Sequence, residues 1–137
     1  MKQKIVGHFP VGVEYCELVL REGTGGEFYA MPEEGHIPRI KVGADQPEWD
    51  DVVVAILHEA LELILSRLKC RYDTTDDQSH DMYDYLFIAQ HKNFSDACVR
   101  LVDFIVPALP AAKKAWENWT RESKKAKLIR TKRKANK

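Results

Sequence analysis

Three ionisable residues stand out on a segment that is otherwise apolar. Between Val52 and Leu65, only His58, Glu59 and Glu62 carry polar side chains. At about 100° per residue, a helix places His58 and Glu62 on one face, one turn apart, with Glu59 on the flank of that face. Burying an unpaired charge is costly, so these residues require a compensating partner. An imidazole and a carboxylate at i and i+4 can hold one metal ion, which leaves Glu59 free to take a proton from water.

A third metal ligand is expected from the segment that follows this helix. The first candidate is His80, with Asp84 one helical turn further on to orient its imidazole. The second candidate is His91. Three protein ligands and one open position suffice for catalytic zinc, so His58, Glu62 and His80 would complete the site. Zinc is the expected ion, and a carboxylate ligand also admits manganese, iron or magnesium.

The run His58-Glu59-Ala60-Leu61-Glu62 resembles the H-E-x-x-H helix motif of zincin-like metallohydrolases, with glutamate in place of the second histidine. It is also similar to small HExxE proteins found in bacteriophage and prophage sequences. The resemblance implies that His58 is the first metal ligand, that Glu59 is the general base and that Glu62 stands at the second ligand position. It further implies a zinc metallopeptidase that acts on a peptide or protein substrate. The alternative is a non-catalytic structural or partner-binding protein that retains a degenerate zincin fold.

A plainer interpretation needs no metal. If the helix is half exposed, Glu59 and Glu62 face solvent and only increase solubility. If the two carboxylates are instead buried, cations must neutralise them, and the nearest in sequence are Arg67, Lys69 and Arg71 at the end of the helix.

The elements ahead of the helix are predicted to be a small sheet of three or four strands in residues 4–42. The apolar runs 14–20 and 27–31 flank a glycine-rich segment at 23–26, which indicates a hairpin. A third run, residues 37–43, contains Pro38. Because proline cannot donate to a strand ladder, this run is expected at a sheet edge, or Pro38 at a strand start.

The central helix is predicted to begin near Trp49, where acidic residues follow Pro47, and to end between Leu68 and Cys70. Its apolar composition on almost every side predicts a buried position.

The C-terminal half is predicted to contain two or three further helices. Ser79 is a candidate cap for a helix through Gln90, and Ser95 for a helix that Pro107 ends. Whether residues 79–106 form one bent helix or two stays open. Pro110 is suited to the first position of a last helix.

These elements predict one α+β domain over residues 1–120, and the resemblance implies that it is of minimal zincin-like type. A small N-terminal antiparallel or mixed sheet is followed by a central metal-binding helix and two to three packed C-terminal helices.

Composition and charge narrow the classes of function. The 137 residues are 45% hydrophobic and 31% charged, which is typical of a globular protein and excludes a disordered one. Residues 121–137 hold nine Lys and Arg against one acid, whereas residues 1–120 hold twelve against twenty. The acidic body makes nucleic acid an improbable partner except through the basic tail, residues 121–137. That tail is either a solvated end or a contact for phosphates or an acidic surface.

The chain has three widely spaced cysteines, Cys16, Cys70 and Cys98. Such a set does not indicate a disulfide framework, so we expect reduced thiols packed as small apolar residues. The first residues contain no apolar run typical of a signal peptide, and no stretch reaches the length of a spanning helix. We therefore expect a cytoplasmic protein with no membrane contact, and the resemblance to phage and prophage proteins implies a bacterial or phage-infected host cell. Oligomeric state stays open.

Overall fold

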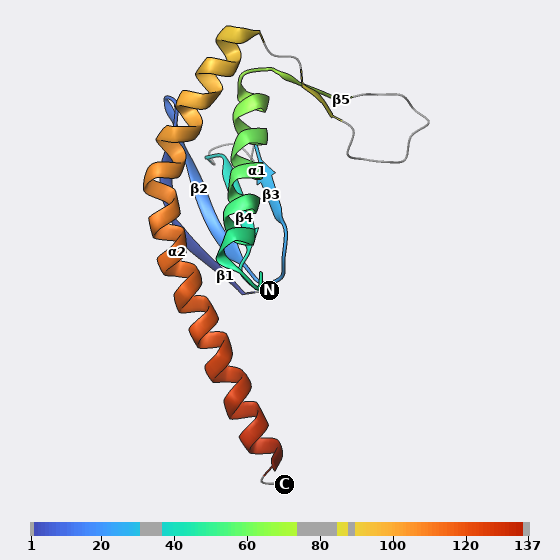
Figure 1. Ribbon diagram of the computed structural model, residues 1–137, viewed down its shortest axis with the longest axis vertical. Helices are drawn as coiled ribbons and strands as arrows, with labels where there is room; N and C mark the ends of the chain where they lie inside the picture. Colours follow the sequence, from blue (N-terminus) through green and yellow to red (C-terminus); the bar gives the residue numbers. More distant parts are fainter. Residues whose placement is uncertain (1, 31–36, 74–84, 88–89, 136–137) are drawn as a thin grey trace, which may run out of the picture.

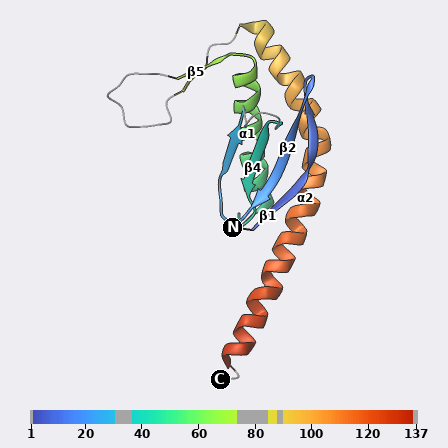
Figure 2. The same ribbon diagram turned by 180° about the vertical axis from the view of Figure 1, so that it is seen from behind.

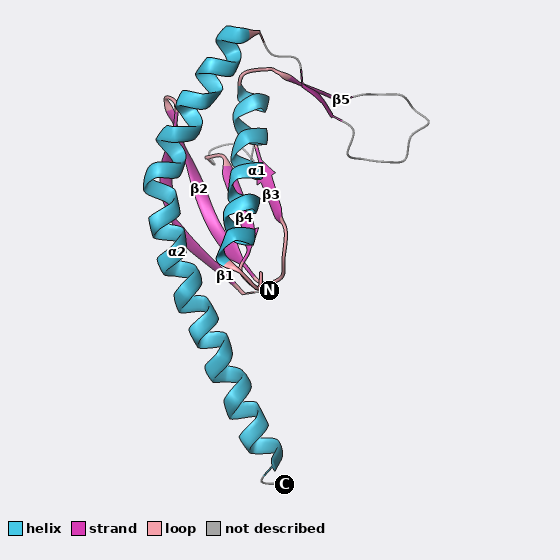
Figure 3. Ribbon diagram, viewed as in Figure 1, coloured by secondary structure: helices cyan, strands magenta, loops and turns pink. Residues whose placement is uncertain are grey.

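The computed structural model describes residues 2–30, 37–73, 85–87 and 90–135. These residues form an α+β fold, as expected, in which a four-stranded N-terminal sheet precedes two helices. Both helices lie on one face of the sheet (Figures 1 and 3), and the reversed view places the strands in front of them (Figure 2). In chain order the elements are β1 (Gln3–Val11), β2 (Glu14–Arg21), β3 (Gly26–Tyr29), β4 (Arg39–Gly43), α1 (Trp49–Arg67), β5 (Arg71–Asp73), β6 (Tyr85–Phe87) and α2 (His91–Ala135).

The sheet is mixed, with the strand order β1-β2-β4-β3. β1 pairs with β2 and β3 pairs with β4 in antiparallel fashion, whereas β2 and β4 are parallel. The hairpin predicted across the glycine-rich segment 23–26 is therefore wrong, because β4 lies between β2 and β3. Ile40 of β4 is paired with Leu18 on one side and with Phe28 on the other. Backbone pairing with a strand from farther along the chain thus overrides the local turn signal.

The third predicted strand, in residues 37–43, corresponds to β4, which is an interior strand of the sheet and not an edge strand. Pro38 lies just before β4, as the strand-start alternative requires, and its carbonyl oxygen accepts a hydrogen bond from Glu17 N at 2.8 Å.

Gly43 allows the chain to cross from β2 to β3 over the end of β4. Its N–H donates to Gly25 O at 2.7 Å, and Asp45 N donates to Gly23 O at 3.0 Å. A Cβ on Gly43 would overlap the backbone of Gly23 and Thr24. The strand order therefore depends on a glycine at this crossing.

The core lies between the sheet and the two helices. On β2, Cys16, Leu18 and Leu20 alternate toward the helices and are fully buried. Phe9 of β1 meets Phe104 of α2 edge to face, with ring centroids 6.0 Å apart. Cys16 and Cys70 are buried as expected, whereas Cys98 is exposed on α2, so the prediction that all three thiols are packed inside is wrong for Cys98.

Helix α1 begins at Trp49, as predicted, and ends at Arg67 with Leu68 as its cap. It is covered on only one side, because Val54 and Leu61 are exposed. The expectation of a helix buried all round is therefore wrong.

Helix α2 runs without interruption from His91 to Ala135, where two or three helices were expected. β6 occupies residues 85–87, inside the segment expected as a helix from Ser79 to Gln90, while residues 74–84 lie outside the described residues. Pro107 does not end the helix.

Pro107 and Pro110 are tolerated because both are exposed on the outer side of α2. The carbonyl groups that lose a partner at a proline reach water there. Ala108, Ala112 and Ala115 lie on the opposite, buried side and let the helix approach the sheet closely. α2 curves along the sheet as a result (Figure 1).

Neither helix, within the part of the chain that the structure describes, is long and apolar enough to cross a lipid bilayer.

Candidate functional site

Glu59 lies on the face of α1 that is turned toward β3. It is 7% exposed, and Glu17 and Glu59 are the buried charged residues of the described chain. Its carboxyl group sits against Gly26, because a Cβ built on Gly26 would stand 2.7 Å from Glu59 Oε1. No hydrogen-bond donor among the described residues reaches this carboxyl group. Glu59 is thus a mostly buried acid that lies against the backbone of β3.

The alternative prediction, in which Glu59 faces solvent on a half-exposed helix, is therefore wrong for this residue. Burial raises the pKa of the Glu59 carboxyl above its ordinary value of 4.5. The adjacent His58 opposes this rise, and the negative charges of Glu62 and Glu27 add to it. The proton affinity of Glu59 is therefore increased mainly by loss of water.

His58 and Glu62 lie side by side one turn apart on α1. Their Nε2 and Oε1 atoms are 3.7 Å apart, with the His58 side chain 64% exposed and that of Glu62 20% exposed. Two ligands of one tetrahedral zinc ion, each about 2.1 Å from the metal, stand roughly 3.4 Å apart. The pair therefore has a separation that suits two ligands of a single small cation.

The third ligand is not found among the described residues. His80 lies outside them. His91 is the first residue of α2, and Asn93 near it contacts Cys70 beyond the end of α1, with Nδ2 3.4 Å from Sγ. Since His58 is nine residues before the end of α1, His91 lies about 14 Å or more from it along the helix axis. Across the described part of the chain, no three His, Cys, Asp or Glu side chains are grouped to hold a metal ion.

A pocket of about 430 Å³ opens beside Glu59, between the N-terminal half of α1 and the start of β3. His58 and Glu59 both line it, whereas Glu62, which the helical spacing placed on the same face as His58, lies outside its lining. The lining consists of Gly25, Gly26, Gln46, Asp51, Val54, Ala55, His58 and Glu59. Glycine backbone, a short apolar wall and the polar side chains of Gln46 and Asp51 therefore surround His58 and Glu59.

Gly25 and Gly26 are the part of the site that the sequence did not indicate. The glycine-rich segment 23–26 was interpreted as a hairpin turn, although its lack of side chains is what brings β3 against Glu59. The run of glycines was visible in the sequence, but no local sequence pattern indicates that it packs against α1.

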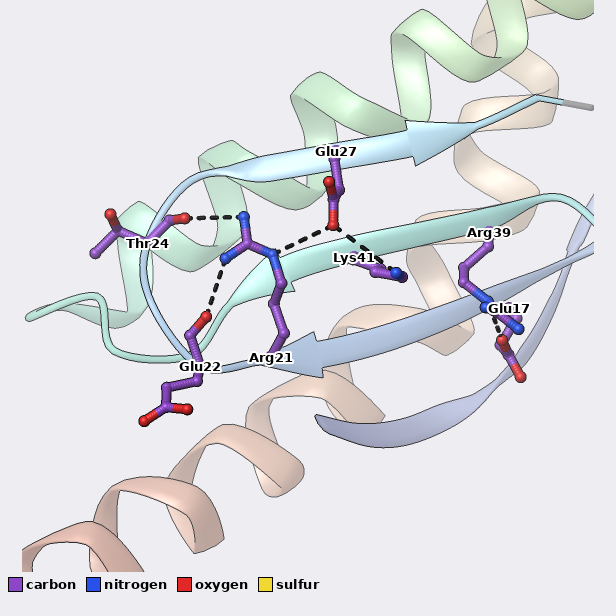
Figure 4. Close-up of polar contacts among 7 residues, drawn as sticks. All are labelled: Glu17, Arg21, Glu22, Thr24, Glu27, Arg39 and Lys41. Carbon is purple, nitrogen blue, oxygen red and sulfur yellow. Dashed lines mark hydrogen bonds and ion pairs between the residues drawn. The ribbon is translucent and has the colours of Figure 1, made fainter. Parts of the chain in front are cut away.

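The other buried acid, Glu17, shows the contrast with Glu59. Arg39 Nε donates a hydrogen bond to Glu17 Oε1, and His8 Nε2 lies 3.4 Å from Oε2. These groups lie on the open face of the sheet, where Glu27 also accepts contacts from Arg21 and Lys41 at 3.5 and 3.9 Å (Figure 4). Acids on the open face are paired across strands, whereas Glu59 is not.

Comparison with protein-family models found no matching family, and no curated protein or solved structure matches the chain significantly. The zincin-like resemblance therefore stays a prediction.

Proposed function

We propose that the protein is a metal-dependent hydrolase of peptide bonds, in which Glu59 is the general base and His58 and Glu62 are ligands of a divalent ion, with zinc the first choice. His80 is the third ligand of this proposal. The observation that supports it best is Glu59 itself, which is buried, raised in pKa and without a hydrogen-bond donor among the described residues.

The burial of Glu59 beside a pocket favours a functional role over a purely structural one. Removing a carboxylate from much of its water costs free energy unless a partner compensates for the loss. Glu17, the other buried acid, is by contrast paired with Arg39. Perturbed, poorly paired acids in pockets are concentrated at functional sites. A pKa raised toward neutrality also makes a carboxylate a better general base.

The chemistry follows from the positions of the three side chains. A divalent ion held by His58 and Glu62 would supply Lewis acidity to polarise a carbonyl group and lower the pKa of water. Glu59 then accepts a proton from the attacking water and delivers it to the departing amine. Val54 and Ala55 form an apolar wall that suits a substrate side chain.

Metal content tests the ligand pair. Protein purified without an affinity tag is dialysed against zinc or manganese and analysed for metal by element, as wild type and as His58→Ala. The matched control is His8→Ala, which removes a similarly exposed histidine beside a glutamate on the sheet. We expect about one ion per chain in wild type and control, and none in His58→Ala. Absence of metal from all three proteins contradicts the proposal.

Turnover tests the base. We expect Glu59→Gln to keep its metal and lose cleavage of a quenched fluorescent peptide library. Glu48→Gln, at the exposed start of α1, is the control and retains cleavage. Cleavage at the wild-type rate by Glu59→Gln would show that Glu59 is not the base.

A second candidate is the non-catalytic partner-binding protein. It is favoured by Val99, Val102 and Val106, which are exposed at helical spacing along α2. This candidate predicts neither metal nor turnover in the two experiments above.

A further inference from the structure

Helix α2 extends beyond the sheet on which it packs. Trp119 Nε1 donates to Asp45 Oδ1 at 3.1 Å, and Lys2 Nζ pairs with Glu122 at 2.9 Å. Among the described residues, this ion pair is the last polar contact between α2 and the rest of the protein. The helix then continues to Ala135, about 20 Å further. Figure 1 shows this end running away from the strands.

The protruding end is strongly cationic. Its described side chains include six exposed cations against one acid, Glu122. At about 100° per residue, Arg121, Lys125 and Lys132 share one side of the helix, Lys127 and Arg130 lie on the opposite half, and Lys124 lies between the two groups. The six cations are Arg121, Lys124, Lys125, Lys127, Arg130 and Lys132.

The cations lie on more than one side of the axis of α2, and this distribution distinguishes between the possible anionic partners. A membrane-bound helix needs a continuous apolar face. Leu128 and Ile129 are separated by about 100° and are interspersed with cations, so this end has no such face. A flat acidic protein surface would meet only one side of the helix. The major groove of a duplex admits a helix and has phosphates along both of its edges.

We propose that the cationic end of α2, residues 121–135, binds the phosphate backbone of duplex nucleic acid. Because its cations contact phosphates, binding is independent of base sequence and depends steeply on salt. Residues 1–120 hold twelve basic residues against twenty acids, so the body is repelled by the same phosphates. Contact is therefore confined to the helical end, of which Lys124, Lys127 and Arg130 also line a hollow of about 710 Å³ beside residues 44–47 of the body.

The test is fluorescence anisotropy of a labelled duplex of about 20 base pairs, with KCl raised from about 50 to 200 mM. The variant Lys124→Gln/Lys125→Gln is compared with Lys113→Gln/Lys114→Gln. The second pair is exposed on the same helix three turns earlier, on nearly the same side, but alongside the sheet. Glutamine keeps helix propensity, and circular dichroism checks the fold.

For wild type we expect log K to fall with log salt at a slope of about −4 to −5, as five or so phosphate contacts require. The variant at residues 124 and 125 weakens binding about tenfold and makes the slope shallower by about 2. The control pair changes affinity by less than about twofold. Equal losses in both variants, or no saturable binding by wild type at about 50 mM KCl, would overturn the proposal.

Two further probes separate the other anionic partners. Phosphatidylserine vesicles and poly-glutamate are tested at the same ionic strength as the duplex. Tighter binding to either one than to the duplex would assign the cationic end to a membrane or to an acidic protein and overturn the nucleic-acid proposal.

Discussion

The carboxyl group of Glu59 lies directly over the backbone of Gly26, so a methyl group on Gly26 would stand 2.6 Å from Glu59 Cγ and 2.7 Å from Oε1. Helix α1 and strand β3 meet at this point, and the acid is confined because the strand offers no side chain there. The geometry of the candidate site and the packing of the fold are therefore coupled through one pair of residues.

We expect Gly26→Ala to destabilise the protein by about 1–3 kcal/mol, because the new methyl group forces the Glu59 side chain out of its place. Adding Glu59→Ala to that variant should recover part of the loss. Urea unfolding of wild type, both single variants and the double variant measures the coupling energy. Additive effects of the two substitutions would show that the residues do not interact.

Replacing Glu59 with glutamine should stabilise the protein at neutral pH. The pKa of Glu59 is raised in the folded state, so the fold is favoured while the carboxyl is protonated, and this stability is lost as pH rises through the raised pKa. We therefore expect Glu59→Gln to melt a few degrees above wild type at pH 7, on the order of 2–4 °C, with little difference at pH 4.

Thermal melts between pH 4 and pH 8 measure this difference, with Glu48→Gln at an exposed position as the control. A wild type that becomes more stable than Glu59→Gln as pH rises would mean that the buried carboxylate has a stabilising partner.

Gly43→Ala should be among the most damaging single substitutions in the chain. Its Cβ would overlap the backbone of the loop that crosses the end of β4, and backbone cannot move aside as a side chain can. We expect a loss of more than about 3 kcal/mol. Gly25→Ala is the contrast, because its Cβ meets open space and only its positive φ of 70° is strained, at about 1–2 kcal/mol. Chemical denaturation should rank the two in that order.

Asp45 joins the crossing loop to α2, since Oδ2 accepts from Gly23 N at 2.6 Å and Oδ1 accepts from Trp119 Nε1 at 3.1 Å. We expect Asp45→Ala to cost about 1–3 kcal/mol, because both donors lose their acceptor. Asp45→Asn keeps one carbonyl oxygen and should cost less. Equal stability of the two variants and wild type in urea would show that water replaces both bonds.

The three thiols should differ in reactivity. Burial raises the pKa of the Cys16 thiol to about 12, and Cys70 is also buried, whereas Cys98 is exposed on α2. A thiol-specific disulfide reagent at neutral pH should therefore label one thiol quickly and two only after unfolding. Cys98→Ser should abolish the rapid phase, and its persistence would place the fast thiol elsewhere.

The proximity of His58 and Glu62 was predictable, because an i, i+4 relation on one helix needs no tertiary contact. The start of α1 at Trp49 was predictable for the same reason, since an acidic first turn and an apolar period are local properties. The burial of Glu59 was not predictable in this way. It depends on β3 lying across α1, and that position follows from the pairing of β3 with β4.

The sequence by itself determined the α+β class, the start of α1 and the separation of an acidic body from a basic end, because periodicity, first-turn charge and net charge are local or additive properties. Only the tertiary structure decided that β4 lies between β2 and β3 and that α2 passes through Pro107. Strand order depends on backbone pairing between distant segments. A proline inside a helix is tolerated or not according to which side of the helix meets water.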